Sequence, residues 1–135
     1  MVGILLLTHA PLGQAFVTAV AHVFRGPTEH FEAIDVTADQ DLVEVHELAR
    51  QAIGRLDEGT GVLVITDIKG GTPANCCNSL ADPGRVEVIA GISLPMLLRA
   101  ITYRRDTLDV VVEMALAGAQ SGAVRVDNRL RVGPA

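Results

Sequence analysis

The sequence of 135 residues contains few aromatic side chains and no tryptophan; the four present are Phe16, Phe24, Phe31 and Tyr103. Aromatic platforms that stack on nucleic-acid bases or sugar rings are therefore not expected. Basic residues are also the minority, because 11 Lys and Arg face 16 Asp and Glu, for a formal net charge of −5. A general nucleic-acid-binding domain needs a basic face, so the composition argues against that class and leaves small-molecule and protein partners open.

Cysteine is scarce, and the two cysteines, Cys76 and Cys77, are adjacent in the sequence. Neighbouring residues in a helix cannot form a disulfide without distortion, so no disulfide framework is expected. No apolar run approaches the ~20 residues that a membrane-spanning helix requires. The first residues, 1–3, lead into an apolar segment with no basic stretch before it, which is not the pattern of a signal peptide. We therefore expect a cytoplasmic protein.

Motifs for metals and nucleotides are also missing. The four histidines, His9, His22, His30 and His46, show neither H-x-x-x-H nor H-E-x-x-H spacing, so no metal site is expected. The first apolar segment is not followed by G-x-G-x-x-G, and no Walker A lysine motif is present. Binding of a dinucleotide or a nucleoside triphosphate is disfavoured, and we expect no cofactor.

Hydrophobic residues make up 49% of the chain and charged residues 20%, which is typical of a folded domain. A chain of this length is long enough to bury a substantial core. No internal repeat or linker is evident, and we predict one domain over residues 1–126. Residues 127–135 are polar and are expected to form a loose C-terminal tail.

Apolar segments alternate with stretches of helical periodicity along the chain. Four apolar segments predict strands, at residues 2–7, 31–36, 62–65 and 86–92. Helices are predicted between and after them, at residues 12–24, 41–56, from Thr72-Pro73 onward, 94–104 and 107–120. This β-α alternation predicts an α/β fold, an open, doubly wound, four-stranded parallel sheet flanked by helices.

Ligands of such sheets bind beyond the carboxyl ends of the strands, where the strand order reverses. His9 follows the first predicted strand and Asp67 follows the third, so the two lie side by side if these strands are neighbours. A carboxylate can accept a hydrogen bond from one imidazole nitrogen and fix the tautomer, which leaves the other nitrogen as a nucleophile. His9 and Asp67 are thus the candidate catalytic residues.

A second motif follows Asp67 closely, the run Gly70-Gly71-Thr72-Pro73. Paired glycines let successive backbone N–H groups point into one concavity, and the start of a helix adds further free N–H groups. Gly70, Gly71 and Thr72 could therefore hold a phosphoryl group carried by His9. The combination indicates phosphoryl transfer through a phosphohistidine, in which catalysis is mainly positioning and charge stabilisation.

Other interpretations of these residues stay open. Taken singly, a histidine at a strand end, an aspartate beside a turn and a glycine pair are usually structural. His9 and Asp67 could also serve a small hydrolase that needs no carrier protein. Lys69 and Arg99 are candidates for docking a partner that carries phosphate or carboxylate groups, although either could simply keep its segment solvated.

The sequence resembles one known family in four segments, at residues 3–9, 61–67, 70–75 and 88–97. The motif Gly-Gly-Thr-Pro-x-Asn, followed by Gly-x-x-x-Pro-Met-Leu, is specific, and the likeness extends to about Val126. On these residues the chain is similar to the mannose-type enzyme IIA component of the bacterial sugar phosphotransferase system. Lys69 departs from that family, whose sugar-transporting members carry bulkier apolar or aromatic residues at this position.

The resemblance implies that His9 accepts a phosphoryl group from the carrier protein HPr and passes it to a separate IIB protein. Asp67 would orient His9, and Gly71 and Thr72 would contact the phosphoryl group. The family fold adds a fifth, antiparallel strand exchanged between the two chains of a homodimer, expected here near residues 122–126. An alternative is a regulatory member of a reduced system, whose phosphorylation state controls a partner protein instead of sugar uptake.

Overall fold

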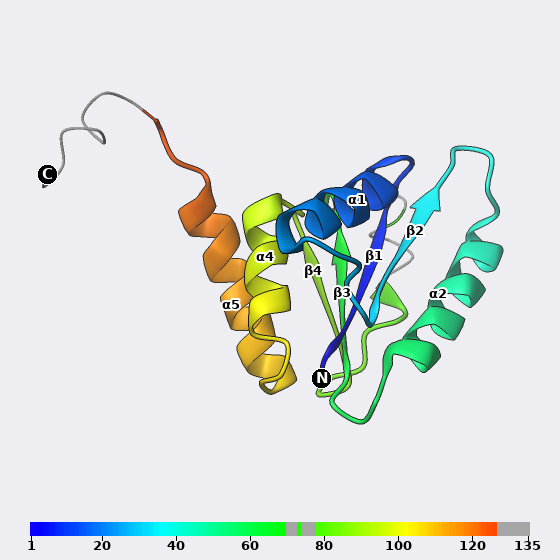
Figure 1. Cartoon of the computed structure of the whole chain (residues 1–135). Coiled ribbons are helices and arrows are strands. Elements are labelled where there is room, and N and C mark those ends of the chain that lie inside the picture. The colour runs from blue at the N-terminus through cyan, green and yellow to red at the C-terminus, as the bar shows by residue number, and fades with distance from the viewer. Residues whose placement is uncertain (70–72, 74–77, 127–135) are drawn as a thin grey trace, which may run out of the picture.

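The structure is a computed structural model, and it describes residues 1–69, 73 and 78–126. Within these residues the chain forms a single parallel sheet with the strand order β2-β1-β3-β4 (Figure 1). The strands are β1 (Gly3–His9), β2 (Phe31–Val36), β3 (Val62–Thr66) and β4 (Val86–Ala90). The predicted α/β class and parallel sheet are confirmed.

The described helices are α1 (Leu12–Phe24), α2 (Leu42–Leu56), α4 (Leu94–Thr102) and α5 (Leu108–Gly122). Three begin at a residue whose side chain accepts a hydrogen bond from the first-turn backbone, namely Asp41, Ser93 and Thr107. Such caps satisfy N–H groups that have no partner inside the helix. The helix expected from Thr72-Pro73 falls largely outside the described residues.

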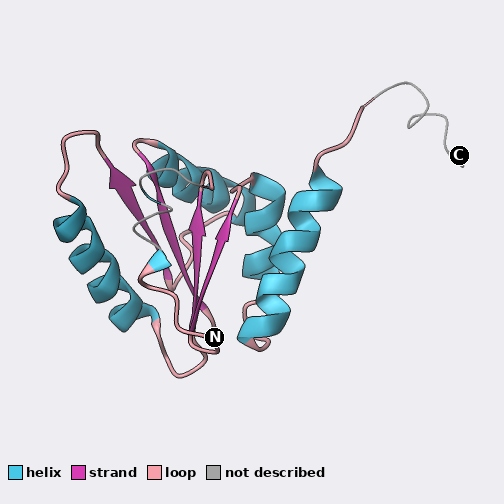
Figure 2. Ribbon diagram, turned by 180° about the vertical axis from the view of Figure 1, so that it is seen from behind, coloured by secondary structure: helices cyan, strands magenta, loops and turns pink. Residues whose placement is uncertain are grey.

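The helices cover both faces of the sheet, with α1, α4 and α5 on one side and α2 on the other (Figures 1 and 2). Side chains of β1 alternate between the two layers, because successive residues of a strand point to opposite faces. Ile4 and Leu6 join the core under α1, α4 and α5, whereas Leu5 and Leu7 join the core under α2. A strand covered on both faces needs apolar residues at every position, which explains the continuous run of the first segment.

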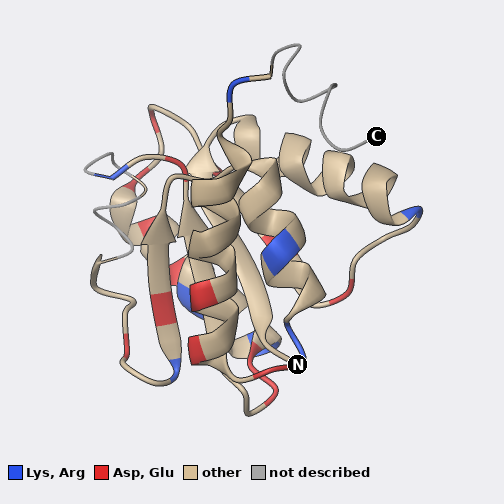
Figure 3. Cartoon of the chain, turned by 90° about the vertical axis from the view of Figure 1, so that its left-hand side faces the viewer, with Lys and Arg blue, Asp and Glu red and all other residues tan. Residues whose placement is uncertain are grey.

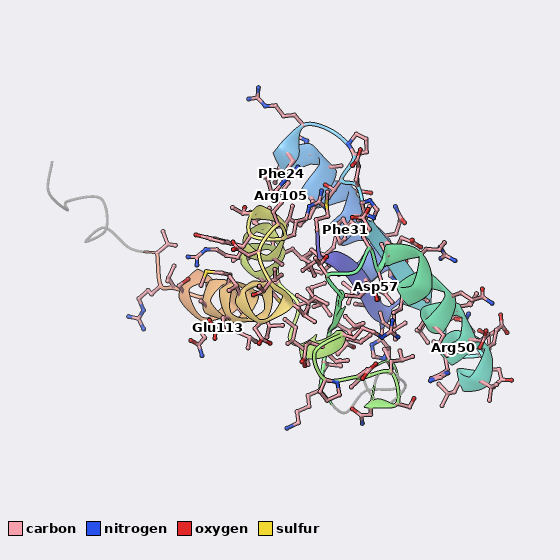
Figure 4. All side chains as sticks on the ribbon, turned by 90° about the horizontal axis from the view of Figure 1, so that it is seen from below. Phe24, Phe31, Arg50, Asp57, Arg105 and Glu113 are labelled. Carbon is pink, nitrogen blue, oxygen red and sulfur yellow. The ribbon has the colours of Figure 1, made fainter. Side chains whose placement is uncertain are left out.

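In the view from below, Arg50 on α2 and Glu113 on α5 lie at opposite sides of the molecule, with Phe31 of β2 between them (Figure 4). Phe31 is buried in the core under α1, α4 and α5. Charged residues are scattered among uncharged ones over the side that carries α4 and α5, with no large patch of one sign (Figure 3).

Several observed bounds differ from the predicted ones by one or two residues, and three of these differences are described here. β1 runs to His9 and not to Leu7, so His9 is the last strand residue. β4 ends at Ala90 and not at Ile92, since Gly91 takes a positive φ of 93° and its N–H bonds the carbonyl of Thr66. The last helix extends to Gly122 and not to Gln120.

The expected fifth strand near residues 122–126 does not form within the single chain. Gly122 is the last residue of α5, where the lack of a side chain allows close approach to Pro95 of α4: a Cβ at Gly122 would lie 2.5 Å from the Pro95 ring. Residues 123–126 have no regular structure and lead away from the helices (Figure 1). The exchanged strand would pair with a second chain, so it stays a prediction, and Gly122 is removed from it to leave residues 123–126. The expected tail at residues 127–135 lies outside the described residues.

Among the described residues, every helix is too short or too polar to cross a lipid bilayer. The longest of them, α2 and α5, have 15 residues each.

Leu6 is fully buried in the centre of β1, and this burial predicts how much stability its truncation would cost. Leu6→Ala should lower the free energy of unfolding by about 2–5 kcal/mol, because it removes buried methyl groups and leaves a cavity. Val43 on α2 is 76% exposed, and Val43→Ala should change stability by less than about 0.5 kcal/mol. Urea denaturation of both variants measures the difference, and equal losses would contradict the described core.

Candidate functional site

The sheet order reverses between β1 and β3, because the chain passes from β1 to β2 on one side and returns to place β3 on the other. The two strands pair in register from Gly3 opposite Val62 to Leu7 opposite Thr66. His9 and Asp67 therefore emerge at the same carboxyl edge, two residues past the last pair on β1 and one past it on β3. This is the place where ligands of doubly wound sheets bind.

The two candidate catalytic side chains are in direct contact. His9 Nδ1 lies 2.8 Å from Asp67 Oδ2, and the backbone N–H of His9 donates to the same oxygen at 3.0 Å. The sequence prediction that His9 and Asp67 lie side by side is confirmed. One carboxylate oxygen thus holds both the ring and the backbone of the histidine, which restricts rotation of the imidazole.

The second oxygen of Asp67 is also engaged. Oδ1 accepts from the backbone N–H of Ile68 at 2.9 Å and from the hydroxyl of Thr66 at 3.4 Å. Burial alone raises the pKa of the Asp67 carboxyl, but hydrogen bonds from the His9 backbone and ring oppose it, and the net pKa is below its ordinary value of 3.8. Asp67 is therefore a carboxylate near neutral pH and can only accept the bond to His9.

The tautomer of His9 follows from this contact. Since Asp67 accepts, Nδ1 of neutral His9 carries the proton and Nε2 holds the lone pair. Nε2 has no hydrogen-bond partner among residues 1–69, 73 and 78–126. The His9 side chain is 49% exposed whereas that of Asp67 is 10% exposed. The acid is sheltered, and the nucleophilic nitrogen of the base is accessible to a reacting group.

A hollow of about 720 Å³ opens beside His9. Its described walls come from the end of β1 and from the segment that joins β2 to α2: His9, Ala10, Val36, Thr37, Ala38, Gln40 and Leu42. The segment is ordered by its own hydrogen bonds, in which Gln40 Oε1 accepts from the Thr37 N–H at 3.2 Å and the Thr37 hydroxyl donates to Asp39 at 2.9 Å. The hollow thus has a defined wall beside His9.

The segment after β2 was missed by reasoning from conspicuous catalytic side chains, because it carries none. The rule that pointed to His9 and Asp67 would have found it, since Val36 ends a strand at the same sheet edge. The signal was the position in the fold and not the residue type.

The remaining predicted site residues lie in different places. Lys69 is exposed and follows Asp67 by two positions, at the same edge of the sheet. Arg99 lies in the second turn of α4, where its side chain packs against Gly118 of α5, and no described contact joins it to His9 or Asp67. Gly70, Gly71 and Thr72, as well as Cys76 and Cys77, lie outside the described residues.

No group of three or more His, Cys, Asp or Glu side chains gathers as a metal site within the described ranges. His9 and Asp67 form a pair and not a cluster of metal ligands. The chemistry that this pair supports is nucleophilic attack by a neutral imidazole whose developing positive charge is stabilised by the carboxylate.

Comparison with known proteins gives the relatives of this chain. The chain is 30% identical over 105 residues to the PTS system mannose-specific EIIAB component of Escherichia coli (strain K12), where PTS denotes a sugar phosphotransferase system. The match covers 76% of this chain and 32% of that protein, so the chain spans about a third of the length of this relative. The fructose-specific EIIA component of Bacillus subtilis (strain 168) is 28% identical over 105 residues, which are 77% of this chain and 71% of that protein.

Solved structures share the fold. The crystal structure of phosphotransferase system component EIIA from Streptococcus agalactiae superposes with a TM-score of 0.82 at 22% identity, covering 93% of this chain and 97% of that chain. The model of the family EIIA-man, described as PTS system fructose IIA component, matches residues 3–116, which include His9 and Asp67. The chain belongs to this mannose- and fructose-type EIIA family of the sugar phosphotransferase system.

Proposed function

We propose that the chain is a phosphocarrier that accepts a phosphoryl group on Nε2 of His9 from phosphorylated HPr and passes it to a separate IIB protein. The single observation that carries the proposal is the 2.8 Å contact between His9 Nδ1 and Asp67 Oδ2. It leaves Nε2 as the unprotonated, accessible nitrogen of an otherwise held ring. Membership of the EIIA family supplies the class of donor and acceptor.

The proposed transfer is a displacement at phosphorus between two imidazoles. The Nε2 lone pair of His9 forms a bond to the phosphorus while the phosphorus–nitrogen bond of the donor histidine breaks, and its electron pair returns to the donor ring. His9 gains positive charge as the new bond forms, and the Asp67 carboxylate, still bonded to the Nδ1 proton, stabilises it. Transfer to the acceptor runs through the same steps in reverse.

The phosphoryl group brings about −1.5 to −2 units of charge at neutral pH and needs donors around it. We assign this role to Gly70, Gly71 and Thr72, for which the support is the sequence motif beside Asp67. Lys69 and Arg99 are proposed to contact the partner proteins, and only Lys69 lies at the edge that carries His9. A cytoplasmic location fits this set of partners.

We also retain the homodimer as part of the proposal. β4 is one of the two outer strands of the described sheet, and it pairs with β3 on one side only. Its other side is therefore an open sheet edge. Val124 and Val126 after α5 are 64% and 83% exposed, and a β-strand added to an open edge would bury such residues. A strand from the partner chain is the simplest means of covering this edge.

Labelling with HPr, enzyme I and radioactive phosphoenolpyruvate tests the function directly. The wild-type chain should take up a phosphoryl group that is labile in acid and stable in base, and His9→Ala should take up none, because the attacking nitrogen is gone. His22, which is exposed on α1, provides the matched control, and His22→Ala should label like the wild type. Equal labelling of His9→Ala would exclude the proposed function.

Asp67→Asn tests the orienting role of the carboxylate. An amide at this position can donate to Nδ1 and favour the tautomer that carries its proton on Nε2, where the phosphoryl group must bond. Transfer from phosphorylated HPr should slow on the order of a hundredfold or more, with the fold retained. Rapid-quench kinetics and circular dichroism measure both quantities, and an unchanged transfer rate would remove Asp67 from the mechanism.

The lowered pKa of Asp67 also predicts a pH dependence of stability. A carboxyl whose pKa is lower in the folded state stabilises the fold above its unfolded value, and this contribution is lost as the pH falls through the folded value. The difference in unfolding free energy between the wild type and Asp67→Asn should therefore shrink as the pH falls below the ordinary carboxyl pKa of 3.8. Urea titrations above and below this value provide the measurement; a difference that grows on acidification would contradict the assignment.

A further inference from the structure

Helix α1, which follows the His9 strand, has no capping side chain of its own. Its N-cap position is Pro11, which makes no side-chain hydrogen bond. The carboxylate of Asp35 on β2 takes this place instead. Its Oδ1 accepts from the backbone N–H of Gly13 at 2.8 Å, and its Oδ2 accepts from that of Gln14 at 3.4 Å. A side chain from a different strand therefore holds the first turn of α1.

The surroundings of this carboxylate are closely packed. Asp35 is paired in register with Thr8 of β1, which is fully buried, and Thr8 Oγ1 has no hydrogen-bond partner within the described part of the chain. A Cβ at Gly13 would lie 2.6 Å from Asp35 Oδ1 and 3.0 Å from Thr8 Oγ1. Only glycine fits at position 13 without displacing the carboxylate, so contact between α1 and the sheet is close at this point.

Three residues, Asp67, Val36 and Asp35, hold the short connection from β1 to α1, which follows His9. The backbone N–H of His9 donates to Asp67, and the N–H of Ala10 donates to the carbonyl of Val36 at 3.0 Å. Asp35 holds the far end of the connection through Gly13 and Gln14. Asp67 and Val36 act at the start of the connection, and Asp35 is the side chain that holds its end.

We propose that Asp35 is a positioning residue for phosphoryl transfer: by capping α1 from the neighbouring strand, it holds the β1–α1 connection so that His9 keeps its bond to Asp67. This inference rests on the proposed function. Asp35 does not touch His9, because Thr8 and Asp35 face α1 whereas the next residue of β1, His9, points to the other face of the sheet. Its effect therefore passes through the backbone.

The cap has a second consequence for the site. The amides of Gly13 and Gln14 are engaged by Asp35, and that of Ala15 bonds the carbonyl of Pro11. A negative group at the first turn of a helix is favourable, and here a carboxylate of the protein already occupies that position. These three N–H groups are therefore not available to the phosphoryl group.

Three variants and one control separate positioning from general stabilisation. Asp35→Ala removes both acceptors, Asp35→Asn keeps one acceptor oxygen for Gly13, and Gly13→Ala displaces the carboxylate without removing it. Thr107→Ala is the matched control, because Thr107 caps α5 through the N–H of Val110 and belongs to no part of the proposed site. The melting temperature of each variant shows how much stability is lost.

The first measurement is the single-turnover rate of transfer from phosphorylated HPr. Asp35→Ala and Gly13→Ala should each slow transfer by about tenfold, because small displacements of a reacting group are costly in rate. Asp35→Asn should restore most of the loss, and Thr107→Ala should transfer at the wild-type rate even where its melting temperature falls as far. Wild-type transfer by Asp35→Ala, or an equal loss in Thr107→Ala, would overturn the proposal.

The second measurement does not depend on transfer. Nitrogen-15 NMR of the His9 ring reports which nitrogen carries the proton, and the wild type should show the Nδ1–H tautomer. Asp35→Ala should shift the ring toward a mixture of tautomers, with Asp35→Asn and Thr107→Ala unchanged. If the wild-type chain accepts no phosphoryl group, the proposed function fails, and the ring spectrum still decides the role of Asp35: an unaltered spectrum in Asp35→Ala overturns it.

Discussion

The hydrogen bond between His9 and Asp67 is the interaction on which the site depends, and it exists because β1 and β3 are neighbours. The residues joined are 58 positions apart in the sequence. Their approach is set by the register of two strands whose paired residues are all buried, and these strands cannot slip by one residue without turning their apolar side chains to the wrong face. The packing of the core therefore fixes the geometry of the polar pair at its edge.

The two partners lie in different environments, and this difference suits the roles proposed for them. Asp67 is sheltered and has hydrogen bonds to both oxygens, so it remains a fixed acceptor. His9 is half exposed and lines the hollow formed with the segment after β2. A histidine that receives a group from a partner protein needs to be accessible, whereas a carboxylate that orients this histidine needs to be held rigidly. The edge of the sheet provides both, with His9 Nδ1 and Asp67 Oδ2 only 2.8 Å apart.

Carboxylates act on the His9 strand from two sides. Asp67 at the end of β3 binds the histidine itself, and Asp35 on β2 binds the helix that follows it. β1 lies between these two strands, so each neighbour contributes one acidic side chain to the β1–α1 connection. The phosphocarrier chemistry is the proposal drawn from the family and from the His9–Asp67 pair, and the arrangement of the two neighbouring strands is how this chain would hold His9 for it.

Much of the fold was predictable from local pattern. The apolar segments and helical spacings located the four described strands and the described helices to within two residues, because both are set by the periodicity of burial. His9 and Asp67 were predictable as strand-end residues, but their pairing was conditional on a strand order that local pattern does not contain. The β2–α2 wall of the hollow and the cap from Asp35 to α1 were not predicted, since neither residue type nor spacing distinguishes them. The strand order and the cap that Asp35 gives to α1 depend on contacts between residues far apart in the sequence. Such contacts form only when the helices pack on both faces of the sheet.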